Sequence, residues 1–153
     1  MLRISRLTDY GTVVLAQLAA SRSGFASASE VAAATGLGLP TVSKLLKNLA
    51  RSGLVDSARG SQGGYRLSRD ARDISAADVI DALEGPVSIT DCSAKDRHCI
   101  LEATCSVGGA WQRINRAIRQ ALKEISLADL LRTNSPLPRF HFAAMPISVE
   151  RKR

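Results

Sequence analysis

Three cysteines in one short segment are the side chains of this sequence best suited to chemistry. Cys92, Cys99 and Cys105 are separated by six and then five residues, and the chain has no other cysteine. Clustered thiolates are soft ligands that suit iron–sulfur clusters, copper(I) or zinc. Zinc sites usually begin with two ligands only two to four residues apart, and no such cysteine pair exists here. The alternatives are three unrelated buried thiols, or a disulfide with one spare cysteine.

A four-ligand centre would need one more side chain than the cysteines supply. The chain has two histidines, His98 and His141, and His98 adjoins Cys99, an awkward position for binding the same metal. No serine or carboxylate pair stands at a spacing typical of catalysis. We therefore expect neither an enzyme nor a small-molecule substrate.

The charge of the chain is positive and unevenly distributed. The formal net charge of +7 favours an acidic partner, either nucleic acid or an anionic membrane surface. Residues 1–70 have nine Lys and Arg against four Asp and Glu, residues 71–110 have three against seven, and residues 111–153 have nine against three. A nucleic-acid surface is therefore expected mainly in the first half, outside the cysteine segment.

The first twenty residues predict an amphipathic helix rather than a secretory signal. Asp9, Gln17 and Arg22 interrupt the apolar residues, which recur at helical spacing. No run of 18 apolar residues exists, so no membrane span is expected. An odd number of cysteines without export fits the reducing cytoplasm, where clustered thiols serve as ligands more often than as disulfides.

The next two predicted helices form a helix-turn-helix. Ser27 and Glu30 have the spacing of a capping box, which starts a helix that ends at Gly36. Pro40 begins the following helix and Gly53 ends it. Two helices joined by a short glycine-containing turn are typical of this motif, which is only moderately specific by itself.

A basic helix face and a glycine-rich hairpin make DNA binding more specific. Strand-like runs at 54–58 and 65–69 surround the loop 59–64, an arrangement typical of a winged helix. Cations hold phosphates, whereas short polar side chains reach base edges and an arginine can enter a minor groove. The candidate DNA-binding residues are Thr41, Ser43, Lys44, Lys47 and Arg51 on the helix, and Arg59, Gly60, Gln62 and Gly63 in the wing.

Two further helices are predicted on either side of the cysteine segment. The first begins at Ser75 and ends at Gly85, with Asp81 and Glu84 facing solvent. The second has apolar residues at alternating steps of three and four, close to a coiled-coil seam, which favours pairing with a second copy. The candidate dimerisation residues are Trp111, Ile114, Ile118, Leu122 and Ile125.

The expected fold is therefore mainly α, a winged helix-turn-helix with a two-stranded wing and a long C-terminal dimerisation helix. Four regions follow from this interpretation: a DNA-binding domain at 1–85, a cysteine loop at 86–109, a dimerisation helix at 110–132 and a flexible tail at 133–153. The tail is expected to be loosely ordered because it contains prolines, isolated apolar residues and a terminal Arg-Lys-Arg.

The motifs of residues 1–132 together resemble the IscR/NsrR family of bacterial transcription regulators. The resemblance rests on Leu-Thr-Asp-Tyr-Gly at 7–11, Arg-Gly-x-x-Gly-Gly-Tyr at 59–65, the three spaced cysteines and Ser-Leu-Ala-Asp-Leu-Leu at 126–131. It implies a homodimer that binds palindromic operator DNA and carries an iron–sulfur cluster near the junction of head and pairing helix. The chain looks most like regulators of the SUF cluster-assembly operon.

The sequence departs from the IscR pattern in the cysteine loop. The first gap is one residue longer than usual, and Ser106, Val107, Gly108 and Gly109 stand where IscR members have a histidine. NsrR-type members use an aspartate from the first helix of the partner subunit, and Asp9 matches that position. Asp9 by itself also fits a solvated first-turn carboxylate favoured by the helix dipole.

The resemblance implies the cluster ligands Cys92, Cys99, Cys105 and Asp9, with either a [2Fe–2S] or a [4Fe–4S] cluster. Solvent and His98 are the alternatives for the fourth ligand. A thiol- or zinc-based redox regulator without a cluster is the alternative function, and a basic scaffold protein for cluster delivery is a third.

Overall fold

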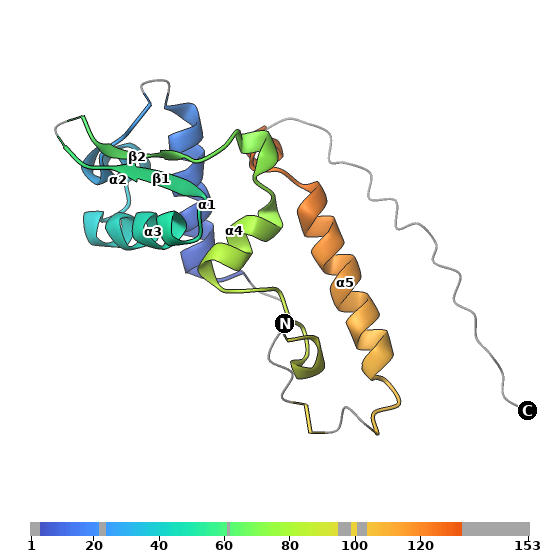
Figure 1. Cartoon of the computed structure of the whole chain (residues 1–153). Helices are drawn as coiled ribbons and strands as arrows, with labels where there is room; N and C mark the ends of the chain where they lie inside the picture. Colours follow the sequence, from blue (N-terminus) through green and yellow to red (C-terminus); the bar gives the residue numbers. More distant parts are fainter. Residues whose placement is uncertain (1–3, 22–23, 61, 95–98, 101–103, 133–153) are drawn as a thin grey trace, which may run out of the picture.

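The chain folds into a compact head from which one long helix projects, as the computed structural model in Figure 1 shows. The structure describes residues 4–21, 24–60, 62–94, 99–100 and 104–132. In chain order the elements are α1 (Arg6–Ala20), α2 (Ala28–Thr35), α3 (Leu39–Arg51), β1 (Val55–Ala58), β2 (Gly64–Leu67), the 3-10 turn η1 (Ala71–Asp73), α4 (Ala76–Leu83), the 3-10 turn η2 (Asp91–Ser93), α5 (Gly108–Glu124) and α6 (Leu127–Leu131). The predicted mainly α winged helix-turn-helix is confirmed.

Local signals set the limits of the helix-turn-helix as predicted. Ser27 and Glu30 form both hydrogen bonds of the capping box at the start of α2. Gly36 ends α2 with φ of 71°, a left-handed conformation that glycine adopts without strain. Pro40 stands in the first turn of α3, where its missing N–H costs no helical hydrogen bond. The turn between α2 and α3 is therefore short and well defined.

The wing is an antiparallel hairpin with a third, shorter contact at its side. β1 pairs with β2 from Val55 opposite Leu67 to Ala58 opposite Gly64. Ala26, in the connection before α2, exchanges backbone hydrogen bonds of 2.9 and 2.8 Å with Tyr65 of β2. The wing is therefore held to the helix-turn-helix through the backbone as well as by side chains.

One apolar core joins the helices and the wing. The face of α3 that points away from solvent supplies Val42, Leu45, Leu46 and Leu49, all with no exposed area. Because the opposite face of α3 is polar, burying this stripe fixes which side chains point outward. The other core members are Val14, Leu15, Leu18, Val31, Leu54, Val55, Ile74, Val79 and Leu127.

The helix α6 returns to the head after α5. Leu127 is fully buried in the head core, and its N–H donates to the carbonyl of Ile74 at 2.7 Å. The N–H of Ala76 donates to the carbonyl of Ile125 at 2.8 Å, so the start of α4 and the end of α5 are joined by a backbone bond. α6 thus belongs structurally to the head, although it follows α5 in the chain.

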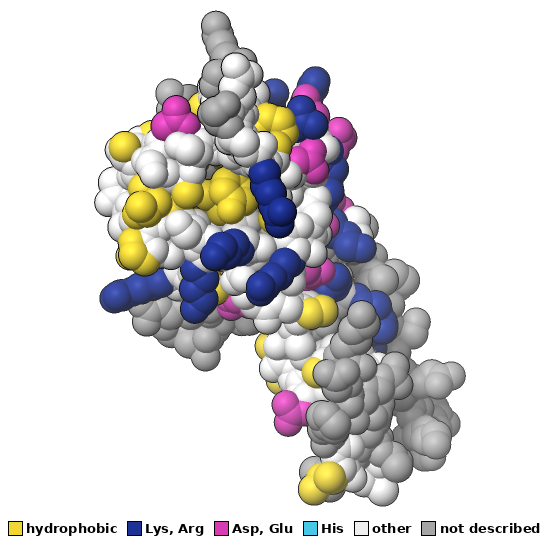
Figure 2. All heavy atoms as spheres, turned by 60° about the vertical axis from the view of Figure 1, so that its left-hand side comes forward, with side chains coloured by type: hydrophobic (Ala, Val, Ile, Leu, Met, Phe, Trp, Pro, Cys, Tyr) yellow, Lys and Arg dark blue, Asp and Glu magenta, His cyan; other side chains and the backbone are white. Residues whose placement is uncertain are grey.

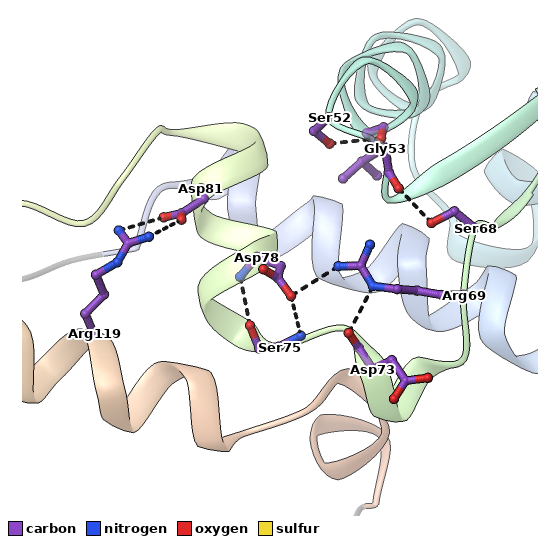
Figure 3. A network of polar contacts seen from close by, with 10 residues as sticks. Ser52, Gly53, Ser68, Arg69, Asp73, Ser75, Asp78, Asp81 and Arg119 are labelled. Carbon is purple, nitrogen blue, oxygen red and sulfur yellow. Dashed lines mark hydrogen bonds and ion pairs between the residues drawn. The ribbon is translucent and has the colours of Figure 1, made fainter. Parts of the chain in front are cut away.

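Of the two acidic residues predicted to face solvent in the α4 region, Glu84 is exposed as expected, whereas Asp81 is not. Asp81 is half-buried and binds Arg119 of α5 through both guanidinium nitrogens, at 3.3 and 2.5 Å (Figure 3). The Glu84 carboxylate accepts hydrogen bonds from the N–H of Ser5 at 3.1 Å and from the hydroxyl of Thr8. The prediction was wrong for Asp81 because helical periodicity does not show which neighbouring helix covers a polar face.

The predicted tail, residues 133–153, lies outside the described residues. None of the helices in the described ranges is both long and apolar enough to cross a membrane.

Candidate DNA-binding surface and cysteine site

The outward face of α3 carries unpaired positive charge. Lys44, Lys47 and Arg51 are exposed, while Thr41 and Ser43, which precede them in α3, are half-exposed. Within the described part of the chain, none of the three cations has a carboxylate partner. Their charge is therefore free to attract phosphates, and the short polar side chains lie on the same face at the start of the helix.

Leu39 is a residue of this surface that the sequence analysis missed. It is the first residue of α3 and, for a large apolar side chain, is unusually exposed, at 45%. Figure 2 shows Lys and Arg side chains gathered beside an apolar patch on the face of the head that lies to the left in Figure 1. The position of Leu39 at the start of a predicted recognition helix was the signal that could have identified it, because such residues meet base edges.

The wing tip depends on glycines with specific backbone roles. A Cβ on Gly63 would lie 2.3 Å from the carbonyl oxygen of Ala58, and one on Gly64 would lie 2.5 Å from that of Ala26. The N–H of Gly63 already donates to the carbonyl of Gly60 at 3.0 Å. Gly63 therefore closes the turn through this bond, and Gly60 is the exposed glycine of the tip.

The two arginines of the wing differ in how their charge is used. Arg66 forms an ion pair with Asp56 at 3.3 Å and lies over the ring of Phe25, 4.7 Å from its centroid. Arg59 is exposed and has no ion-pair partner among the described residues. Arg59 is thus the wing cation that remains free for a ligand.

The cysteine segment lies at the end of α5 far from α6 (Figure 1). All three thiols are free: Cys92 and Cys99 are half-exposed, and Cys105 is exposed. No three His, Cys, Asp or Glu side chains of the described residues lie close enough together to hold a metal ion. The structure therefore brings the cysteines into one region but does not assemble them into a site, and His98 lies outside the described residues.

Cys92 is the cysteine with the clearest surroundings. It stands in η2, and its sulfur lies 3.2 Å from the hydroxyl oxygen of Thr90. Its carbonyl accepts a hydrogen bond of 3.4 Å from Nε2 of Gln112 on α5. The carbonyl of Cys92 is thus bonded to α5, and its sulfur lies within hydrogen-bonding distance of the Thr90 hydroxyl.

Asp9 does not lie with the cysteines of its own chain. It is exposed in the first turn of α1, and it borders an apolar hollow together with Leu122 of α5 and Ile125, which directly follows α5. Cys92 contacts α5 at Gln112, ten residues before Leu122, which corresponds to about 15 Å along the helix. Asp9 is therefore remote from Cys92 within one chain.

The predicted pairing stripe of α5 has two parts. Trp111 and Ile114 are exposed by 42% and 44%, which is high for large apolar side chains. Ile118 and Leu122 line a second apolar hollow with Ile4 and Ile80 of the same chain, and the half-buried Ile125 lines the hollow that Asp9 borders. The stripe is thus partly covered by its own head and partly open.

The comparisons with known proteins agree with this geometry. Residues 4–133 match the family model of Rrf2, described as iron-dependent transcriptional regulators. An HTH-type transcriptional regulator of Azotobacter vinelandii, ORF2, is 34% identical over 131 residues, covering 85% of this chain and 79% of the relative.

Two solved structures share the fold along most of the chain. CymR (YrzC), the global cysteine regulator of B. subtilis, has a TM-score of 0.69 and 31% identity, covering 88% of this chain and all of the other. IscR of T. potens has a TM-score of 0.62 and 32% identity, covering 85% and 86%. The family and these relatives are transcription regulators and not enzymes. The chain is a DNA-binding winged-helix transcription regulator of the Rrf2 family.

Proposed function

We propose that this regulator is a homodimer that binds palindromic operator DNA and changes its affinity with the state of an iron–sulfur cluster held by Cys92, Cys99 and Cys105. The observation that carries the proposal is that three free thiols lie in the segment preceding α5, in a chain whose head has an unpaired basic helix. The resemblance to SUF regulators makes genes of iron–sulfur cluster assembly the proposed targets. Reducing cytoplasm, which keeps thiols free, is the proposed location.

The donor set fits such a cluster in its chemistry. Three soft thiolates within one segment are ligands of the type that iron–sulfur clusters require. Because they are half-exposed or exposed and not joined by a disulfide, they can converge without breaking a core. The bound cluster supplies a group that gains or loses an electron, or is lost altogether, when oxygen or nitric oxide reaches it.

Asp9 of the partner subunit is the proposed fourth ligand. Its own chain holds Asp9 next to the C-terminal half of α5, away from Cys92. Antiparallel or crossed pairing of two α5 helices would bring the opposite end of one helix toward the head of the other. A single carboxylate oxygen is a hard ligand, and we therefore expect it to release more easily than a thiolate.

DNA recognition is divided between the two exposed surfaces of the head. Lys44, Lys47 and Arg51 hold phosphates, whereas Thr41 and Ser43 reach base edges from the first turns of α3. Leu39 supplies an apolar contact that suits the methyl group of thymine. Arg59, with Gly60 and Gln62 beside it, enters a minor groove, and Gly63 shapes the tip on which Arg59 stands.

A thiol- or zinc-based redox regulator is the second candidate. It is favoured by the separation of the three thiols among the described residues and by the exposure of Cys105. The similarity to a global cysteine regulator points in the same direction.

Anaerobic purification with iron, sulfide and zinc analysis separates these candidates. The cluster predicts a brown protein with iron and acid-labile sulfide in equal amounts and with charge-transfer absorption. A colourless protein, with zinc or with no metal, contradicts the cluster and supports the second candidate. Loss of colour on replacing each cysteine with alanine assigns the ligands.

A further inference from the structure

Helix α5 has a polar stripe beside its apolar stripe, formed by Gln112, Asn115 and Arg119. Their spacing of three and four residues places them on one face of the helix. Each bonds either to α4 or to the stretch of chain that leads from α4 to Cys92. Gln112 donates to the carbonyl of Cys92 at 3.4 Å, Asn115 accepts from the N–H of Ile89 at 3.2 Å, and Arg119 binds the carboxylate of Asp81.

Asn115 is the central member of the polar stripe. It is the one buried residue of α5, with 7% of its surface exposed. A buried amide is retained where it satisfies a specific partner, and here its Oδ1 accepts the Ile89 N–H three residues before Cys92. The intervening Thr90 has its hydroxyl 3.2 Å from the sulfur of Cys92 and 2.9 Å from the hydroxyl of Ser93. Asn115 therefore fixes the backbone from which the Cys92 thiol projects.

Polar contacts continue from the stripe to the DNA-binding elements. Arg119 binds Asp81 of α4, and Asp78 on the same helix accepts from Arg69 at 3.2 Å (Figure 3). Ser68, next to Arg69 and just after the wing, donates to the carbonyl of Gly53 at 2.7 Å, in the turn that follows α3. The Cys92 segment, α5, α4 and the end of the recognition helix are thus joined by successive bonds.

We propose that Asn115 is a positioning residue for Cys92, and that the polar stripe carries displacement of the Cys92 segment to the DNA-binding head. The proposal rests on the proposed function, in which the state of the cysteines alters DNA affinity. When Cys92 moves, the segment must either break its bond to Asn115 or move α5 with it. If α5 moves, α4 must shift relative to the rest of the head, because Arg119 of α5 binds Asp81 of α4.

The positioning role is tested by amide hydrogen exchange in full-length, reduced protein from which a chelator has removed any metal. The result of this test then does not depend on a cluster. The Ile89 amide of the wild-type chain is expected to exchange with solvent much more slowly than the amides of the exposed residues 105–107. Exchange of Ile89 at the rate of those amides would overturn the proposal without any variant having to fold.

Alkylation of the cysteines provides the second measurement. Asn115→Leu keeps the volume but removes the acceptor, and it should raise the labelling rate of Cys92 severalfold while that of Cys105 stays unchanged. Asn115→Asp retains an acceptor oxygen and should restore slow labelling. Gln120→Leu, on the same helix but with its amide bonded to Glu124 of that helix, is the matched control. Equal Cys92 labelling in Asn115→Leu and the control would refute the positioning role.

Transmission to the head is tested by DNA affinity. We expect cluster-loaded and cluster-free protein to differ in Kd by about tenfold, a typical coupling between two sites. In Asn115→Leu and in Arg119→Met, this ratio should fall toward one while the affinity of the cluster-free protein is retained. An unchanged ratio in both variants would contradict transmission. A ratio of one in the unmodified protein would contradict the proposed function itself, whereas the exchange and labelling results would still decide the role of Asn115.

Discussion

The guanidinium of Arg119 binds the carboxylate of Asp81 through two nitrogens, at 3.3 and 2.5 Å, and so joins the projecting helix α5 to α4 of the head. The side chains are 30% and 28% exposed, which shields them partly from water. Two-point pairing of this kind fixes direction as well as distance, because the planar guanidinium must face the carboxylate. This pair therefore joins α5 to the head in addition to the backbone bond between Ala76 and Ile125.

The Arg119–Asp81 pair should contribute a measurable coupling energy. We expect Arg119→Met and Asp81→Asn each to lower the free energy of unfolding. The loss in the double variant should be smaller than the sum of the two single losses by about 1 kcal/mol. Urea unfolding of the wild type, the two single variants and the double variant measures this double-mutant cycle. The more exposed pair of Arg66 and Asp56 is the control and should give a smaller value. Strict additivity for Arg119 and Asp81 would show that the pair does not hold α5.

The cations of α3 should act on DNA through charge alone. Replacing Lys44 and Lys47 by alanine in both subunits of a dimer removes about four phosphate contacts, so the slope of log affinity against log salt should fall by roughly three to four. Affinity should fall to a similar extent for all sequences. Fluorescence anisotropy across a salt series measures both quantities. Lys123→Ala, an exposed cation on α5, is the control, and an unchanged slope in the α3 variant would mean that this face is merely solvated.

The apolar stripe of α5 should support dimerisation. Ile118→Glu places a charge in a half-buried apolar position, which costs several kcal/mol if the charge cannot reach water. We expect the dimer to dissociate and binding to a palindromic site to weaken strongly. Sedimentation velocity measures the association, and Gln120→Glu on the exposed side of the same helix should leave it intact. A wild-type monomer at micromolar concentration would contradict the homodimer.

Asp9 should matter to the cluster and not to the fold. Asp9→Ala is expected to alter the absorption spectrum of the cluster or to speed its loss in air, whereas each cysteine-to-alanine change abolishes it. Mixed dimers of Asp9→Ala with a triple-cysteine variant should retain at most one intact site. Asp73→Ala removes an exposed carboxylate elsewhere in the head as a control. A cluster unaffected by Asp9→Ala would leave Asp9 as a helix-start carboxylate.

Glu84 should make stability depend on pH in the acidic range. Hydrogen bonds from Thr8 and Ser5 hold the pKa of this carboxyl below its ordinary value of 4.5. Because the folded pKa is lower than the unfolded one, the stabilisation is present above pH 4.5 and is lost as the pH falls through the folded pKa. The Tm difference between wild type and Glu84→Gln should therefore shrink on acidification between about pH 7 and pH 3. Glu124→Gln is the control, and a difference independent of pH would contradict the role of the carboxylate.

The amino-acid sequence by itself determined the winged helix-turn-helix, because its limits are set by contacts within a few residues. The capping box of Ser27 and Glu30, Pro40 in the first turn of α3 and the glycines of the wing each act on their own segment of backbone. The apolar spacing of α3 also fixes its outward face, so the sequence alone identifies the polar and basic candidate DNA-binding residues of this helix, although not the exposed Leu39.

Tertiary structure alone decided how the cysteine segment is joined to the head. Asp81 meets Arg119 across 38 positions of the chain, and Ile89 meets Asn115 across 26, which no local pattern encodes. The burial of Asn115 and the separation of Asp9 from Cys92 follow from how α5 packs against α4. Periodicity shows that a helix has an apolar and a polar side, but only packing decides which neighbour each side meets, because several neighbours can satisfy the same pattern.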